Sequence, residues 1–294
     1  MNWLLLLALV LLWGTSFMFI SISVETIDPL SVVFSRVLIG AILLTFIAYV
    51  KGLYLPFTRK AWFAFLVMGM IGNVLPFFLI TWGQLSINSG IAGMIMAIMP
   101  LMTMLLAHYF VEGEDLNRYK IIGFALGLGG IILLLGPVFE GGGQAVFGGI
   151  AVFFAAVSYA VNTILVRRFP KFNPIVGAAG VLIGASITML PIWLIQAPPL
   201  TTQMSNNSML SVIWLGIGPT AIATLLLFAV IERAGPTFLA TINYMIPVVA
   251  FFAGAYILSE PVELSSLFAL AIILSGIAFT RFRANSLRPA IPEN

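Results

Sequence analysis

The sequence is dominated by long apolar stretches that follow one another with only short polar breaks. A helix needs about 20 apolar residues, each rising 1.5 Å, to cross the hydrocarbon core of a bilayer. The runs are continuous instead of alternating at every second residue, which excludes a transmembrane β-barrel. We therefore predict an all-α integral membrane protein with ten transmembrane helices. The expected spans are Trp3–Ser21, Leu30–Val50, Ala61–Trp82, Asn88–Phe110, Tyr119–Pro137, Val146–Val166, Pro174–Gln196, Met209–Ile231, Pro236–Leu258 and Glu263–Phe282.

Few charged residues interrupt these stretches. Charged residues make up 8% of the 294 residues, whereas roughly 25% are charged in a typical soluble domain. The chain has no cysteine and one histidine, and its aspartates and glutamates all fall in loops or at helix ends. The glycines at 141–143 are not followed by the lysine of a phosphate-binding loop. We therefore expect no enzyme activity, no cofactor and no bound metal.

The basic residues indicate how the chain is oriented in the membrane. If both termini are cytoplasmic, every lysine and arginine except Arg36 lies in a cytoplasmic loop or in the tail. These residues are Lys51, Arg59, Lys60, Arg118, Lys120, Arg167, Arg168, Lys171, Arg233, Arg281, Arg283 and Arg288. Such a bias is the positive-inside rule, so the net charge of +3 reflects topology and not a nucleic-acid partner. We expect a multi-pass protein of the inner (plasma) membrane with cytoplasmic termini.

The second half of the chain repeats the plan of the first. Three kinds of residue recur at an offset of about 147 positions, which pairs Pro100 with Pro247, Glu114 with Glu260 and Gly130 with Gly276. The pentapeptide at 37–41 also recurs identically at 181–185. Because each half holds five helices, an odd number, the halves must cross the membrane in opposite orientations, as in many secondary transporters. The predicted organisation is one repeat at 1–140, a second at 141–285 and a cytoplasmic tail at 286–294.

Four prolines lie near the middle of predicted spans, where each kinks its helix and frees the carbonyl four residues earlier. They form two symmetry pairs, Pro76 with Pro219 and Pro100 with Pro247. A single proline of this kind often only curves a helix, but interrupted helices at matching positions of two halves point to a transport site. The carbonyls expected to be free are those of Gly72, Met96, Leu215 and Asn243.

Polar and aromatic side chains cluster near these breaks and are the candidate lining of a solute cavity. Buried amides in lipid need partners or water, so they face the helix bundle or a cavity. The alternative is that the amides join neighbouring helices and the hydroxyls bond their own helix. The residues predicted to contact a solute are Trp13, Asn73, Phe77, Ser158, Tyr159, Asn162, Asn243 and Tyr244.

Arg36 is the only basic residue well inside a predicted span, about two turns from its outer end, since Lys120 and Arg281 lie one residue from the end of theirs. A charge at a helix centre costs about 2.5–3.5 kcal/mol on insertion scales, and less where the side chain reaches an interface. Glu25 and Asp28, in the adjoining outer loop, are the expected partners. Arg36 is therefore interpreted as an anion or carboxylate site, as part of an outer gate, or as a structural arginine that reaches the interface.

With these features the chain resembles the EamA family of the drug/metabolite transporter superfamily, over nearly its whole length. The resemblance rests on an ordered set of motifs. They are Trp13-Gly14-Thr15-Ser16-Phe17 in the first helix, Pro29 with Arg36 and Ala41 in the second, Glu114 with Gly123 and Gly130 after the fourth, and Glu260 with Gly276 after the ninth. Ala269 replaces the middle glycine of the second copy, and Ser21 and Ser23 stand where many members have a lysine.

The resemblance implies an inner-membrane carrier, often an exporter of amino acids or other small metabolites, with a cavity lined mainly by helices 1, 3, 4, 6, 8 and 9. An efflux carrier for drugs or cationic compounds is the alternative, and a receptor or scaffold without transport activity is a third reading. The expected partners are a small-molecule solute and the lipid bilayer, and both a monomer and a homodimer are compatible with the sequence.

Overall fold

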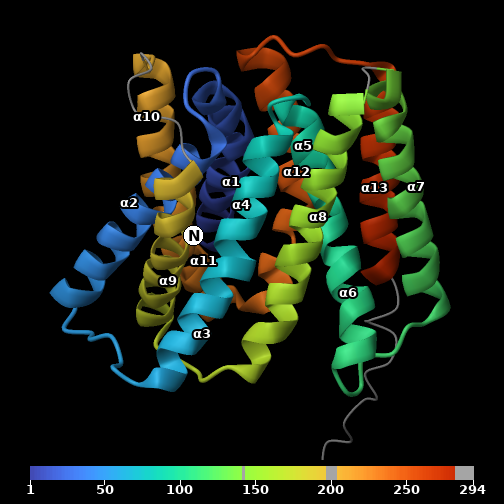
Figure 1. Cartoon of the computed structure of the whole chain (residues 1–294). Helices are drawn as coiled ribbons and strands as arrows, with labels where there is room; N and C mark the ends of the chain where they lie inside the picture. The colour runs from blue at the N-terminus through green and yellow to red at the C-terminus, as the bar shows by residue number, and fades with distance from the viewer. Residues whose placement is uncertain (141–142, 197–203, 282–294) are drawn as a thin grey trace, which may run out of the picture.

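The computed structural model describes residues 1–140, 143–196 and 204–281, and all the regular structure within these ranges is helical (Figure 1). The described ranges contain thirteen α-helices, and short π- and 3₁₀-helical segments join some of them. The α-helices are α1 (Asn2–Val24), α2 (Pro29–Val50), α3 (Arg59–Gly69), α4 (Leu75–Gly83), α5 (Ser89–Ile95), α6 (Met99–Phe110), α7 (Arg118–Glu140), α8 (Gly143–Leu165), α9 (Pro174–Gln196), α10 (Asn206–Leu215), α11 (Ala223–Leu239), α12 (Ile242–Ile257) and α13 (Leu264–Arg281). The predicted tail at 286–294 lies outside the described residues.

Eight helical segments of the described chain are long and apolar enough to cross a membrane. Two further apolar helices, Ile242–Ile257 and Leu264–Thr280, are shorter. The boundary between the eighth and ninth predicted spans coincides with Gly235, whose φ of 81° is outside the helical region and interrupts α11. A residue with a side chain adopts such an angle at an energetic cost, so glycine permits the break there.

Non-α segments interrupt three of the long helices. The π-helical segment η1 (Met70–Val74) ends two residues before Pro76, the π-helical segment η4 (Gly216–Ile222) contains Pro219, and the 3₁₀ segment η2 (Met96–Ile98) precedes Pro100. The π pattern replaces the i→i−4 bond with a longer one, as when the Leu75 N–H donates to the carbonyl of Met70. Such π segments are rare, and they are often found at functional sites.

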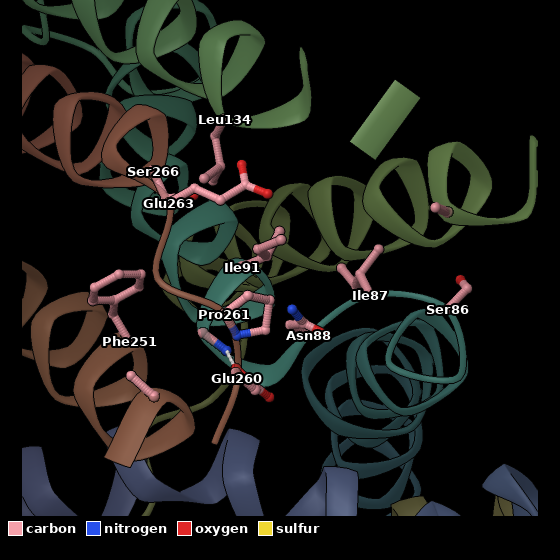
Figure 2. A pocket seen from close by; sticks show the side chains of 13 residues that line it. Ser86, Ile87, Asn88, Ile91, Leu134, Phe251, Glu260, Pro261, Glu263 and Ser266 are labelled. Atoms are coloured by element: carbon pink, nitrogen blue, oxygen red, sulfur yellow. Dashed lines mark hydrogen bonds between the residues drawn. The ribbon is translucent and has the colours of Figure 1, made fainter. Parts of the chain in front are cut away.

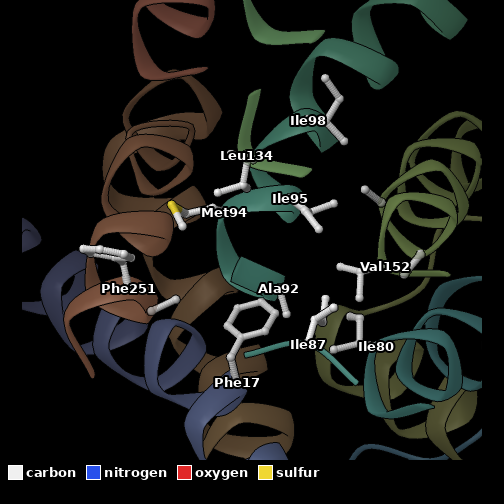
Figure 3. Packing of buried hydrophobic residues seen from close by; sticks show 14 of the residues in the cluster. Phe17, Ile80, Ile87, Ala92, Met94, Ile95, Ile98, Leu134, Val152 and Phe251 are labelled. Carbon is white, nitrogen blue, oxygen red and sulfur yellow. The ribbon is translucent and has the colours of Figure 1, made fainter. Parts of the chain in front are cut away.

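The largest cluster of buried side chains joins both halves of the chain (Figure 3). It brings Phe17 of α1, Ile95 of α5 and Phe251 of α12 into one apolar core. Glycines permit the closest helix approaches outside this core. A Cβ at Gly123 would lie 2.5 Å from the Gly276 carbonyl oxygen on α13, and one at Gly184 would lie 2.5 Å from that of Phe65 on α3. These glycines therefore let the backbones of α7 and α13, and of α3 and α9, approach closely.

The two ends of the bundle differ in charge. The loops at 51–58, 111–117 and 169–173 lie at one end, which we name the Glu114 end, and the turns at 25–28, 84–88 and 258–263 lie at the other, the Glu260 end (Figure 1). The residues in and beside the loops of the Glu114 end include eight lysines and arginines, which are Lys51, Arg59, Lys60, Arg118, Lys120, Arg167, Arg168 and Lys171. The three turns of the Glu260 end contain no basic residue, and two of them, 25–28 and 258–263, contain acidic residues.

Candidate functional site

Arg36 lies on α2 between the two π segments, both of which pack against that helix. Its side chain is buried, with the residue 5% exposed. The Nε–H donates to Thr220 Oγ1 of η4 at 2.9 Å, and the guanidinium carbon lies 3.8 Å from the centre of the Phe77 ring on α4. Tyr159 of α8 interacts electrostatically with the same guanidinium. Four elements that are distant in sequence therefore meet at this arginine.

The expected ion pairs of Arg36 with Glu25 and Asp28 are wrong. Within the described ranges the only ion pair joins Lys120 and Glu114. The Asp28 carboxylate instead accepts the backbone N–H of Ser31 at 3.0 Å and caps the first turn of α2. Capping satisfies an otherwise unpaired helix N–H next to the aspartate in sequence, whereas Arg36 is two turns away.

The first π segment supplies a backbone acceptor, although not the predicted one. With i→i−5 bonding, Pro76 leaves the carbonyl of Ile71 without a backbone donor, one residue earlier than the Gly72 carbonyl expected for an α-helix. Ser158 Oγ of α8 donates to the Ile71 carbonyl at 2.7 Å. A Cβ at Gly72 would lie 2.5 Å from Asn162 Nδ2, so the Asn162 amide packs directly on this segment. Asn162 Oδ1 is buried and has no hydrogen-bond partner in the described structure.

The second π segment is held by side chains on both sides. The Leu215 carbonyl, predicted to be free, accepts the Thr220 hydroxyl at 2.8 Å. Trp13 Nε1 of α1 donates to the carbonyl of Pro219 at 3.0 Å. The two π segments thus occupy equivalent places in the two halves and share a pattern of side-chain bonds to backbone carbonyls.

The other proline pair is less symmetric than predicted. Pro100 opens α6 after the 3₁₀ segment, and the Met96 carbonyl expected to be free accepts the N–H of Met99. Pro247 lies inside α12, which continues through it, and the chain leaves the helix earlier, at 240–241. The tighter 3₁₀ turn re-pairs Met96 because it bonds to the residue three places ahead.

Three predicted cavity residues lie away from the contacts of Arg36 described above. Asn73 is half-buried in η1, and Asn243 is half-buried in the first turn of α12. Neither amide makes a side-chain hydrogen bond within the described chain. Tyr244 packs at the edge of the main core cluster. Their contact with a solute stays a prediction.

Glu260 forms the contact that sequence reasoning missed, because it appeared there only as a marker of the repeat. Its carboxylate accepts the backbone N–H groups of Ser89, at 2.7 Å, and Gly90, at 3.0 Å, at the start of α5. The chain leaves α12 near Ser259, which has a φ of 55°, and the Glu260 N–H donates to the Gly254 carbonyl at 3.1 Å. This turn directs the Glu260 side chain towards the start of α5. We name this arrangement the Glu260 clamp, since it joins the end of α12 to the start of α5.

The clamp borders a cleft of about 190 Å³ at the Glu260 end (Figure 2). Figure 2 shows Glu260 beside Asn88 and Pro261, while Glu263 lies across the cleft near Leu134. A Cβ at Gly254 would collide with the Glu260 carboxylate, which explains the glycine there. The close approach of α5 and α12 continues at Gly93, where a Cβ would collide with that of Ala250.

The Glu114 end has no equivalent contact within the described residues. Glu114 is paired instead with Lys120 at 3.8 Å, and its backbone carbonyl is 3.0 Å from His108 Nδ1. Here α6 packs mainly on α8, whereas α12 packs mainly on α1 and α5. The unit formed by α5 and α6 therefore meets α12 at the Glu260 end, through α5, and separates from it towards the Glu114 end, where α6 packs on α8. No three His, Asp or Glu side chains of the described chain are placed to hold a metal ion.

Comparison with known proteins identifies the family. The sequence profile of the EamA-like transporter family matches the chain twice, over residues 1–136 and 146–282. The chain belongs to this family. The resemblance seen in the motifs is thereby confirmed, and EamA membership makes the chain a multi-pass membrane protein of a transporter family rather than of an enzyme family.

Relatives of this EamA protein cover nearly its whole length at low identity. They include the uncharacterized transporter YoaV of Bacillus subtilis, 22% identical over 94% of this chain and 95% of its own. The uncharacterized inner membrane transporter YedA of Escherichia coli is 26% identical, over 98% and 92%. A crystal structure with 23% identity matches 97% of this chain and 99% of its own with a TM-score of 0.71, which concerns the fold alone.

Proposed function

We propose that this EamA protein is a secondary transporter that moves a small organic metabolite across the inner membrane by alternating access. The observation that carries the proposal is the twofold match of the family profile, at 1–136 and 146–282. Two matches of one profile are the expected result of a duplicated half. Equivalent π segments in the two halves, one followed by Pro76 and the other containing Pro219, support the same conclusion.

The proposed topology has ten spans in two inverted repeats, residues 1–140 and 141–285. The shorter helices α12 and α13 complete the count, since α12 is preceded by a further helical turn at 236–239. The gathering of basic residues supports a cytoplasmic location for the Glu114 end and an external location for the Glu260 end. Both termini are then cytoplasmic.

The moving parts in this proposal are the two interrupted helical units, α5–η2–α6 and α11–α12. Their close packing at the Glu260 clamp closes the external side, and their divergence at the other end leaves the cytoplasmic side open. In the opposite state the equivalent glutamate, Glu114, would cap the start of the helical turn at 236–239 while the Glu260 clamp opens. Arg36, Pro76, Pro100, Pro219 and Pro247 are proposed as gating or kink residues.

The solute is proposed to bind between the two π segments. Contacts would come from the residues that the structure gathers there, Trp13, Phe77, Ser158, Tyr159 and Asn162, and from Asn73, Asn243 and Tyr244 as the path changes shape. Their mixture of aromatic faces and polar atoms suits an amphipathic solute.

The test is solute flux through the purified full-length protein in liposomes. Counterflow of labelled metabolites, with the solutes first ranked by their effect on the melting temperature, should give uptake that empty liposomes lack. A solute that stabilises the protein and exchanges across the membrane supports a carrier. A solute that binds without exchange would contradict the proposal and favour a receptor.

A further inference from the structure

Arg36 carries a buried positive charge for which the described chain offers no opposite charge. Charged groups near α2 are Glu25 and Asp28 in the preceding turn, and neither forms an ion pair with it. Among the titratable groups of the described residues, the hydroxyl of Tyr159 on α8 interacts with it electrostatically. Burying a charge without a counter-charge is unfavourable, and in membrane spans such residues mark solute pathways.

The hydrogen bonds of Arg36 leave most of its donors unused. A guanidinium has five N–H donors, and one of them, on Nε, is bonded to Thr220. The Thr220 hydroxyl gives its own proton to the Leu215 carbonyl, so it acts only as an acceptor towards Arg36. The four N–H groups on the two terminal nitrogens have no hydrogen-bond partner among the described residues.

The surroundings fix the orientation of this donor set. Thr220 holds Nε from the side of η4, and the Phe77 ring lies against one face of the guanidinium plane. The terminal nitrogens then form a planar fork, which matches the two oxygens of a carboxylate. A lysine could supply the charge but not this paired geometry.

We propose that Arg36 binds the carboxylate of the transported solute, so that the substrate class is small carboxylates, either zwitterionic or anionic, and not organic cations. The proposal rests on the transport function proposed above. Within the described apolar spans the only aspartate or glutamate is Glu232, which is exposed near the break of α11 at Gly235, so the net charge at the depth of Arg36 is positive. The unpartnered Oδ1 of Asn162, one helical turn from Tyr159, supplies an acceptor for an ammonium group and favours zwitterions.

The experiment compares acids with their amides on the purified full-length protein. The melting temperature is measured with the standard amino acids and with short mono- and dicarboxylates, each beside the matching carboxamide. We expect stabilisation only by members with a free carboxylate, with an apparent affinity about tenfold or more above that of the carboxamide. Arg36→Gln should abolish this preference, and Arg36→Lys should keep part of it.

Two outcomes would overturn the proposal. One is that no carboxylate stabilises the wild-type protein, or that carboxamides and amines stabilise it equally. The other is that Arg36→Gln lowers the melting temperature of the empty protein but leaves the shift produced by carboxylates unchanged, which is the signature of a structural arginine. If Arg36→Gln does not fold, the comparison of acid with amide on wild type and Arg36→Lys decides the question.

Flux measurements separate this proposal from the transport function. If carboxylates bind through Arg36 but do not cross liposome membranes, the Arg36 site stands and the transport proposal fails. If transport is observed equally for acids, carboxamides and cations, the transport proposal stands and the Arg36 site fails. Because the chain has no cysteine, Arg36→Cys adds a direct check. This variant should react with a water-soluble thiol reagent if Arg36 faces the solute path, and protection from the reagent would contradict the proposal.

Discussion

The Glu260 clamp makes a prediction about which side of the transporter is open. Replacing Glu260 by glutamine keeps the size of the side chain but removes its charge. One amide oxygen can still accept an N–H from Ser89 or Gly90, but the NH₂ group then faces the second backbone N–H, and two donors cannot bond. The closed external side should therefore be destabilised by Glu260→Gln, with little change to the fold.

The size of this effect follows from the bonds that are lost. A hydrogen bond to a charged group contributes about 1.5–3 kcal/mol net, and a carboxylate at a helix N-terminus adds about 0.3–1 kcal/mol. Glu260 is half-buried, so the lower part of this range applies, about 2 kcal/mol. If the bonds exist only in the externally closed state, the population of the externally open state should rise about thirtyfold.

The absence of cysteine allows a clean measurement of this population. Ala250→Cys places one thiol on α12 where it faces Gly93, buried and one helical turn, about 6 Å, from Gly254, against which the Glu260 carboxylate lies. A membrane-impermeant maleimide added outside intact cells should react with this thiol only in the externally open state. Its labelling rate should rise about thirtyfold when Glu260→Gln is combined with Ala250→Cys.

Glu263→Gln is the matched control for this experiment. Glu263 lines the same cleft, but it accepts only the hydroxyl of Ser265, at 3.1 Å, and does not reach α5. The labelling rate should therefore be unchanged in the control. Equal labelling rates in the two glutamine variants would refute the clamp as a closing element.

Three further predictions test the kinks and the packing. Pro100→Ala and Pro247→Ala should insert normally into the membrane but slow the initial rate of transport in liposomes. Pro191→Ala in α9, outside the moving units, should leave the rate unchanged. Wild-type rates in both Pro100→Ala and Pro247→Ala would remove the kinks from the mechanism. Gly184→Ala should lower the melting temperature, at a cost of about 1–3 kcal/mol, because its Cβ would lie 2.5 Å from the Phe65 carbonyl oxygen. The control is Gly177→Ala on the same helix, whose Cβ would meet only Phe172, at 3.5 Å, and which should be tolerated. Ser158→Ala leaves the Ile71 carbonyl unpaired and should cost about 1–3 kcal/mol of stability. The control is Ser275→Ala, because the exposed Ser275 hydroxyl bonds only to its own helix. Equal melting temperatures for these two variants would contradict the role of Ser158.

The sequence predicts most of the long helices because apolar length is a property of each segment alone. It also places the interruptions, since proline cannot donate a backbone bond wherever the helix packs. It does not predict which carbonyl is released. That choice depends on whether the helix opens into a π or a 3₁₀ turn, and Ser158, which meets the Ile71 carbonyl, is 87 positions away in the chain.

The contacts of the charged residues were the least predictable part of the site. Asp28 is the acidic residue nearest to Arg36 on the preceding turn, but it caps its own helix. Glu260 bonds to an N–H group 171 positions away, so its role is visible only once the end of α12 lies beside the start of α5. Hydrophobicity predicts where a helix lies, whereas these polar contacts depend on how helices from the two halves are placed against each other.

In the proposed mechanism the repeat also accounts for a preference for the externally closed state. The offset that relates Pro100 to Pro247, in the same helical units, places Pro236 and Thr237 in the positions of Ser89 and Gly90. Proline has no N–H, so a clamp made by Glu114 would have one backbone donor fewer than the Glu260 clamp. Its competing ion pair with Lys120 is exposed and contributes about 0–1 kcal/mol, so it does not prevent the exchange. The difference of one charge-assisted bond, about 1.5–3 kcal/mol, favours the externally closed state at rest while leaving the other within reach of a bound solute.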